Sequence, residues 1–198
     1  MKYFNALPKI IKTEANGTQT VYTNIMARAN LLTDVLKDPV LFYYYDIQDG
    51  DTPEIVADKY YGDSYRYWLV LLPNNIIDPQ WNWPLSGRNF VNYVEGKYTS
   101  PYSTVHHYEK IISQYESASQ ITTKNVIEID EDTYNGLSDS VKNYEFDSGT
   151  TTVTITKRAV SQYDYELEKN EAKRNIKLLK KDFAWQMEKE LGRLMGNG

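Results

Sequence analysis

The chain has 198 residues, of which 25% are charged, and it carries a net charge of −5 with a sequence pI near 5.1. This acidic balance argues against a nucleic-acid partner bound through a basic face, and a 41% share of hydrophobic residues argues against wholesale disorder. The absence of cysteine excludes disulfides, thiolate nucleophiles, Cys-ligated zinc and iron–sulfur clusters.

Residues 1–23 read as an N-terminal arm or hairpin. Lys9-Ile10-Ile11 and Val21-Tyr22 flank Asn16-Gly17, a pair suited to the positive φ angles of a turn. Neither this segment nor any later one has an apolar run of the length of a secretory signal or a membrane span. We therefore expect a product made in the cytoplasm, with no membrane partner.

A short amphipathic helix is predicted from Asn24. Ile25, Ala29, Leu32 and Leu36 share one helical face, and Asp38-Pro39 ends the pattern.

Residues 43–73 read as strand, turn, helix, tight turn and helix. The run Val40–Ile47 is dense in aromatic and β-branched residues, and Asp49-Gly50 turns the chain. Thr52 as N-cap, Pro53 at the first helical position and Gly62 at the end delimit the first helix. The second helix begins at Asp63 or Ser64, carries Tyr65, Trp68, Leu69 and Leu72 on one face, and stops at Pro73.

Residues 81–96 contain one more predicted helix, after which the helical spacing of apolar residues is lost. Trp81 and Trp83 lie in an aromatic loop, and Ser86 could cap a third helix that Gly96 closes. Over 101–159 the chain reads as a small β insertion, with strands expected at Thr104–Ile112, Asn125–Ile129 and Thr151–Thr156.

Residues 160–198 are predicted to form a long C-terminal helix, because no proline or glycine interrupts them before Gly192. About 30 helical residues would span ~45 Å. Leu178 and Trp185 fall almost opposite the main apolar face, so this helix would need cover on two sides. The residues on the main face are Ile176, Leu179, Phe183, Met187, Leu191 and Leu194.

The chain contains 18 tyrosines and 4 tryptophans, residue types enriched in the buried parts of interfaces. An aromatic-rich core would give the same composition, and composition alone does not separate the two. We predict a partner interface formed by Leu178, Phe183, Trp185, Met187, Leu191, Trp81 and Trp83.

No set of residues indicates catalysis, and we expect no enzyme, cofactor or metal site. His106 and His107 would point to opposite faces of a strand, so they cannot act together without a bulge. Asp49, Asp51 and Glu54 suggest a carboxylate pair for glycoside cleavage, but turn formation and helix capping account for all three. Asp130-Glu131-Asp132 departs from the pattern of a calcium loop and is better explained as a solvated acidic turn. The basic residues of 173–181 could suggest a nucleic-acid site, but with acidic residues at positions 166, 168, 171 and 182 they are better explained as part of a solvated helix face.

The segment Tyr45–Gly62 resembles the opening of a LysM module, in which a strand leads through a Gly-Asp-Thr turn into a helix ending near a Tyr-Gly pair. Asn74-Asn75 falls where such modules often carry asparagine. The resemblance implies a LysM-like βαα core. A LysM module would close its sheet soon afterwards, whereas here a further helical pattern follows.

A wider resemblance covers residues of about 20–100 and 160–195. Tyr67–Leu72, Asn74–Pro79, Trp81–Ser86 and Asn170–Leu179 look like the baseplate wedge protein 53 family of T4-like contractile-tail bacteriophages. The resemblance implies a structural, non-enzymatic part of the virion tail baseplate. It would join neighbouring wedges around the central hub in sixfold symmetry, with other wedge subunits, the hub and neighbouring copies as partners.

The sequence thus predicts an α+β fold with a LysM-like βαα core, extra helices, a small β insertion and a long C-terminal helix. The expected parts are residues 1–23, 24–100, 101–159 and 160–198. A LysM-type peptidoglycan-binding module remains the alternative function.

Overall fold

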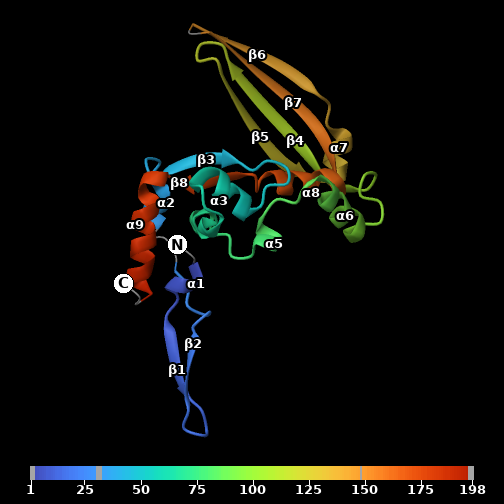
Figure 1. Cartoon of the computed structure of the whole chain (residues 1–198). Coiled ribbons are helices and arrows are strands. Elements are labelled where there is room, and N and C mark those ends of the chain that lie inside the picture. The colour runs from blue at the N-terminus through green and yellow to red at the C-terminus, as the bar shows by residue number, and fades with distance from the viewer. Residues whose placement is uncertain (1–2, 30–32, 148, 196–198) are drawn as a thin grey trace. The chain divides into compact units, whose positions relative to one another are not determined.

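The computed structural model describes residues 3–29, 33–147 and 149–195, which form helices and antiparallel sheets (Figure 1). The chain divides into two compact units. The first unit combines residues 1–87 with 170–198, and the second comprises residues 88–169.

The first unit begins with α1 (Tyr3–Ala6) and a hairpin of β1 (Lys9–Thr13) and β2 (Gln19–Thr23). Short helices and one small sheet make up the rest of the unit. In chain order these are α2 (Thr33–Lys37), β3 (Phe42–Asp46), α3 (Pro53–Tyr61), η1 (Ser64–Arg66), α4 (Trp68–Leu71), η2 (Leu72–Asn74), α5 (Pro79–Asn82), β8 (Asn175–Leu179) and α9 (Lys181–Leu194).

Strands β3 and β8 pair antiparallel although the helices from α3 to α5 and all of the second unit lie between them in sequence. Phe42 lies opposite Leu179, and Tyr45 lies opposite Ile176. Helices α3 and α4 lie between these strands in the chain order. The result is a β-α-α-β arrangement whose last strand is supplied from near the C-terminus.

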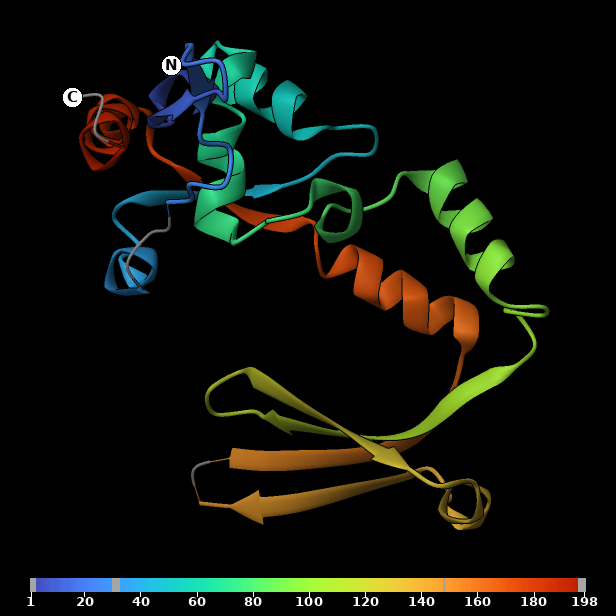
Figure 2. The same ribbon diagram turned by 90° about the horizontal axis from the view of Figure 1, so that it is seen from below.

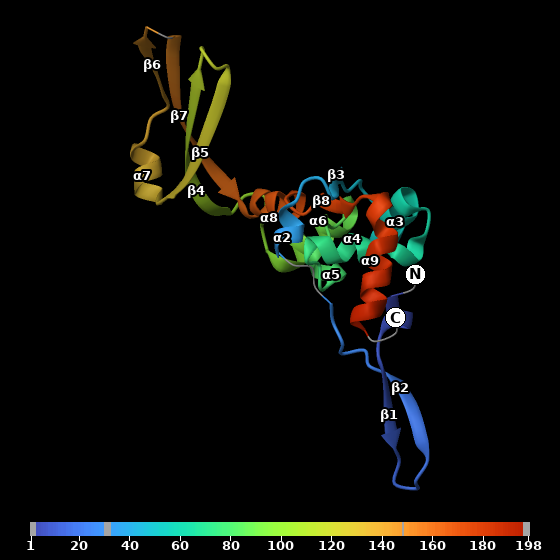
Figure 3. The same cartoon turned by 90° about the vertical axis from the view of Figure 1, so that its left-hand side faces the viewer.

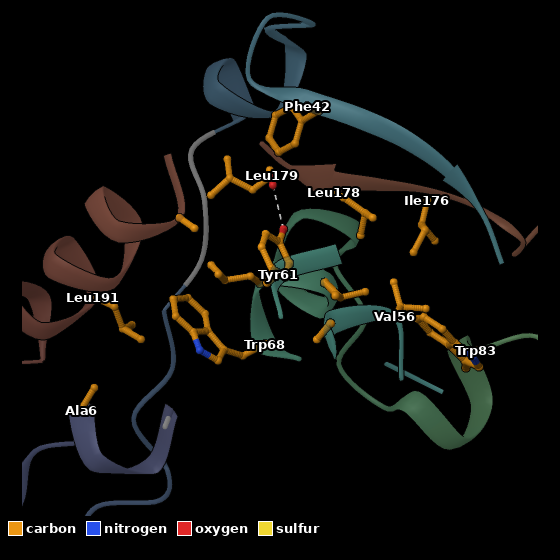
Figure 4. Close-up of a cluster of buried hydrophobic side chains, with 14 of the residues drawn as sticks. Ala6, Phe42, Val56, Tyr61, Trp68, Trp83, Ile176, Leu178, Leu179 and Leu191 are labelled. Atoms are coloured by element: carbon orange, nitrogen blue, oxygen red, sulfur yellow. Dashed lines mark hydrogen bonds between the residues drawn. The ribbon is translucent and has the colours of Figure 1, made fainter. Parts of the chain in front are cut away.

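The core of the first unit lies between this sheet and the helices, where side chains from β8, α3, α4 and α9 meet (Figure 4). Leu178 is fully buried, and Val56, Trp68 and Leu191 each expose 3% or less of their surface. The Tyr61 hydroxyl donates a 2.8 Å hydrogen bond to the carbonyl oxygen of Leu179, which ties α3 to β8. Burial raises the pKa of Tyr61, so this hydroxyl stays protonated as a donor.

The local signals in the sequence act as predicted around α3. The Thr52 hydroxyl accepts a 3.3 Å hydrogen bond from the backbone N–H of Ile55, with Pro53 in the first turn. Gly62 ends the helix at φ 69°, a conformation that favours glycine because it has no Cβ. The second predicted helix is shorter and is divided into η1, α4 and η2, with Asp63 capping η1 through the N–H of Tyr65.

The prediction of one long C-terminal helix was wrong. Helix α8 (Gln162–Glu171) ends before residue 175, β8 follows, and α9 has only 14 residues. Side chains with good helix propensity, such as Lys177, Leu178 and Leu179, form a strand here because β3 offers them a backbone partner and an apolar face. Tertiary pairing therefore overrides local preference.

The predicted amphipathic helix from Asn24 is also shorter than expected. The structure describes only α2 in this region, Ile25 is 69% exposed outside any helix, and Leu32 lies outside the described residues.

The second unit contains a helix, α6 (Gly87–Lys97), and a four-stranded antiparallel sheet in the order β5-β4-β7-β6 (Figure 2). The boundary between the units falls after Gly87, the first residue of α6. Strand β6 was not predicted, since its polar residues hide the strand pattern. The other elements are β4 (Val105–Glu116), β5 (Ile121–Ile129), α7 (Glu131–Gly136), β6 (Ser140–Phe146), β7 (Gly149–Ser161) and α8.

Helices α6 and α8 pack together at the start of this sheet. The Phe90 and Tyr163 rings meet edge to face with centroids 5.5 Å apart. Glu166, which is 6% exposed, accepts hydrogen bonds from Lys97 Nζ at 2.8 Å and from the Tyr98 hydroxyl at 2.9 Å. This paired carboxylate fixes the two helices because an unpaired buried charge would be costly.

Replacing Tyr61 by phenylalanine removes one buried hydrogen bond and leaves the Leu179 carbonyl without this donor. We expect the free energy of unfolding to fall by about 1–3 kcal/mol, measured by chemical denaturation. Tyr44→Phe is the matched control, since Tyr44 is 54% exposed. Equal stabilities of the two variants would contradict the assigned link between α3 and β8.

A second pair of variants tests whether residue 178 lies in a buried strand, as in the structure, or on an exposed helix face, as the sequence predicted. Leu178→Ala should cost about 2–5 kcal/mol, as expected for a leucine buried in a core. Trp185→Ala, at a position 64% exposed, should change stability by no more than about 0.5 kcal/mol. Thermal and denaturant unfolding measure both, and similar small losses would show that Leu178 lies on a surface.

Candidate partner interface

The structure divides the seven residues predicted for a partner interface into three groups. Leu178, Leu191 and Trp83 are buried within the first unit, with 0%, 2% and 7% of their surfaces exposed. They are removed from the candidate interface because the chain itself covers them. Phe183 and Met187 are partly buried against the same core.

Trp83 shows why an aromatic loop residue became part of the core. Its indole N–H donates a 2.7 Å hydrogen bond to the carbonyl oxygen of Asp51, which satisfies its one polar group inside the protein.

Only Trp81 and Trp185 remain as large exposed members of the set, at 61% and 64% exposure. Trp185 lies on α9, with the ammonium of Lys189 5.5 Å from its ring centroid. Leu194 on the same helix is 60% exposed. Exposed aromatic and aliphatic groups of this size are candidates for contact with another protein.

The hairpin of β1 and β2 offers a larger exposed surface, which the predicted interface did not include. In the register of the hairpin, Ile10 lies opposite Tyr22 and Ile11 opposite Val21, so each face carries one apolar pair. All four side chains are between 47% and 63% exposed. The hairpin extends away from the helices of its unit (Figure 3).

This hairpin meets the physical conditions for a binding arm. An isolated two-stranded hairpin is marginally stable in water, and each of its outer edges presents unpaired backbone groups. Its turn is well formed, because Gly17 takes φ 83° and its N–H donates to the carbonyl oxygen of Glu14 at 2.9 Å. A partner that covers the apolar pairs or adds a strand would stabilise it.

A second exposed group lies on β3, beside α3. Tyr43 and Tyr44 are 53% and 54% exposed, and the Tyr43 ring stacks on that of Tyr60 at 5.9 Å. The ammonium of Lys181 lies 5.1 Å from the Tyr60 ring centroid. The excess of tyrosine seen in the composition is thus partly on the surface.

Asn74 covers the edge of β8 that does not face β3. Its side-chain amide donates to the carbonyl oxygens of Val70 at 2.7 Å and Lys177 at 2.8 Å, and its Oδ1 accepts from the Lys177 N–H at 2.8 Å. One side chain therefore takes the place of a neighbouring strand. The sequence marked this asparagine, but its edge-capping role depends on a strand that the sequence did not predict.

Among the candidate catalytic residues, Asp51 is held in a structural role. Its carboxylate accepts hydrogen bonds from Lys59 Nζ at 2.6 Å, the Tyr45 hydroxyl at 2.7 Å and the Gln48 N–H at 3.2 Å. Burial favours the neutral acid, but these bonds, that of Lys59 above all, outweigh burial and lower the pKa of Asp51.

Burial, followed by the bond to Asp51, raises the pKa of Tyr45 to about 12. The ionised carboxylate of Asp51, held by three donors, therefore stabilises the turn before α3. It is poorly suited to donate a proton in catalysis.

The two histidines lie closer together than the sequence indicated. A bulge between Val105 and His107 brings the two Nδ1 atoms to 2.9 Å, and His107 Nε2 lies 3.3 Å from a carboxylate oxygen of Glu109. The two side chains meet because the bulge breaks strand alternation, which is the one condition under which the sequence allowed it. Within residues 3–29, 33–147 and 149–195, no cluster of three or more histidine, aspartate or glutamate side chains could hold a metal ion.

The other charged groups singled out in the sequence have local partners. Asp130 caps α7 by accepting 2.8 Å hydrogen bonds from the N–H and the hydroxyl of Thr133. In the basic run, Lys173 donates to the carbonyl oxygen of Trp81 and Arg174 pairs with Glu171. In the described part of the chain, no helix has the length and apolar character to cross a membrane.

The low pKa of Asp51 predicts a pH dependence of stability. Above the ordinary aspartate pKa of about 3.9 the carboxylate stabilises the fold, and this contribution is lost as the pH falls through the lower folded-state pKa. Asp51→Asn should therefore lower the free energy of unfolding at pH 7 by about 1–3 kcal/mol, and the difference from wild type should shrink below about pH 4. Denaturation at several pH values measures this, and a difference independent of pH would contradict the role.

We compared the chain with known proteins in two ways. No curated protein matches the chain. A protein-family model described as base plate wedge protein 53 matches residues 3–191, which covers all of the second unit and nearly all of the first. Since the match extends over nearly the whole length, the chain belongs to the base plate wedge protein 53 family and has a structural role in the phage tail baseplate.

Proposed function

We propose that this chain is a non-enzymatic connector that joins neighbouring baseplate wedges around the central hub in a sixfold assembly. The observation that carries the proposal is the hairpin of β1 and β2, with an apolar cross-strand pair on each face and two open edges. Membership of a baseplate wedge family supplies the setting in which such an arm would find its partner. The exposed Trp81 and Trp185 extend the candidate contact surface of the same unit.

We further propose that β3, α3, α4 and β8 form a LysM-like unit. The element order, the Gly-Asp-Thr turn before α3 and the antiparallel pairing of β3 with β8 support this assignment. The closing strand, expected soon after the second helix, would then be displaced to β8 by the insertion of residues 75–174. Asn74, which caps the edge of β8, would stabilise the unit at the point where the insertion begins.

Peptidoglycan binding is the second candidate function. It is favoured by a hollow beside the turn before α3, to which Asp46, Gln48, Asp49 and Asn175 contribute polar groups. Retention of the purified chain on insoluble peptidoglycan, saturable and displaced by soluble fragments, would favour this function over the connector.

The connector proposal predicts that a variant of the arm is defective in assembly but not in folding. Ile11→Thr with Val21→Thr removes one apolar cross-strand pair and keeps β-branched side chains in both strands. On co-expression with the other wedge subunits, the wild-type chain should elute in a defined complex, and the variant should be lost from it with unchanged thermal stability.

The matched control is Lys12→Gln with Thr20→Ser, at the neighbouring pair of the same hairpin. It should assemble like the wild type. A wild-type chain that stays monomeric in the presence of the wedge subunits would overturn the proposed function.

A further inference from the structure

The four-stranded sheet of the second unit has two unlike faces. The register brings nine large apolar residues to one face, which we call the isoleucine face: Tyr108, Ile112, Ile121, Ile127, Ile129, Tyr144, Phe146, Val153 and Ile155. The opposite face carries a row of threonines along β7, at positions 150, 152, 154 and 156, and, on the other strands, only four large apolar residues, Ile111, Tyr115, Val126 and Val141. Such asymmetry is typical of a sheet with one face covered and one face in water.

Within the described residues of the second unit, only α7 covers the isoleucine face, at one end of the sheet (Figure 2). There the Tyr134 ring lies 4.5 Å from that of Tyr108, and Lys157 Nζ donates to the Tyr134 carbonyl oxygen at 2.8 Å. Farther along the strands, Ile127, Tyr144 and Phe146 are 42%, 48% and 61% exposed.

The end of the isoleucine face away from α7 is hollowed. Tyr144, Phe146 and Val153 supply the apolar part of the lining, and Gln114 and Thr151 supply polar groups beside them. A concave apolar site with a few polar groups fits a protruding side chain from another protein.

The charges on the isoleucine face indicate what kind of surface would cover it. Lys110, Lys142 and Lys157 project from this face, with Glu116 as the acidic member at its far end. Lys157 bonds to α7, whereas Lys110 and Lys142 form no ion pair with any residue in the described part of the chain. Covering these two ammonium groups without carboxylates would carry a desolvation cost.

We propose that the isoleucine face binds a protein surface that is apolar and carries carboxylates opposite Lys110 and Lys142. A second copy docked through the same face would bring two surfaces of net positive charge together, which disfavours self-association. A lipid surface is also disfavoured, because Lys110 lies between Ile127 and Lys157 in the middle of the sheet and not at a rim where it would reach headgroups. The inference rests on the proposed function for the setting in which this partner is met.

The test uses the full chain reconstituted with the other wedge subunits. Lys110→Glu with Lys142→Glu should weaken incorporation by at least about tenfold, because reversing a charge that faces an opposite charge in an interface replaces attraction by repulsion. Lys124→Glu reverses a lysine on the threonine face and should assemble within about twofold of wild type. A second variant, Ile127→Thr with Phe146→Thr, removes the apolar part and should also weaken incorporation, with folding checked by circular dichroism.

Failure of this inference differs from failure of the connector function. If wild type and every sheet variant enter the wedge equally well, the connector stands and the isoleucine face is not its contact. If wild type does not enter the wedge, the connector fails.

A zero-length carbodiimide cross-linker, which joins amines to carboxylates in direct contact, tests the charge pairing itself. In the assembled wedge, Lys110 or Lys142 should be linked to an acidic residue of another protein. Links from these lysines to a second copy of this chain would overturn the proposal. So would binding of the purified chain to phosphatidylglycerol vesicles that the lysine reversals abolish.

Discussion

The antiparallel pairing of β3 with β8 is the interaction on which the first unit depends. It joins residues 42–46 to 175–179 and places Leu178 between the sheet and the helices α3 and α4. The Tyr61 hydroxyl and the Asn74 amide then satisfy backbone groups of β8 that the two-stranded sheet leaves unpaired. Since the second unit is inserted between these strands, the first unit cannot close until the chain on both sides of the insertion has come together.

This arrangement explains which parts of the fold could be predicted from sequence. The cap at Thr52, the glycine at residue 62 and the turn at Asn16-Gly17 are local signals, and each acts within a few residues of itself. Strand β8 carries no such signal. Lysine and leucine at 177–179 favour a helix locally, and only a partner far away in sequence makes them a strand.

Which residues of the predicted interface are exposed likewise depends on partners far away in sequence. Leu178 and Trp185 were expected together on one side of a single helix, opposite its main apolar face, and the structure separates them into a buried strand residue and an exposed helix residue. The arm of β1 and β2 and the isoleucine face were missed because exposure depends on what a strand packs against. The contact between His106 and His107 was missed because a bulge cannot be read from alternation.

A connector account makes physical sense of where this chain places its apolar groups. The core of the first unit is closed by its own strands and helices, so it does not need a partner to be formed. The arm and the isoleucine face, in contrast, leave large side chains in water on thin β structures, which is costly for a protein that remains alone. Membership of the base plate wedge family implies assembly with other baseplate components, and a connector would use these to cover both surfaces.

Hydrogen–deuterium exchange of the chain, alone and within the reconstituted wedge, would show whether partners cover the arm and the sheet. We expect the backbone amides of β1, β2, β5 and β6 to become strongly protected on assembly, and those of β3 and β8 to be protected to the same extent in both states. Unchanged exchange in the arm and in the sheet would contradict this expectation, because these surfaces would then remain open to water in the finished baseplate.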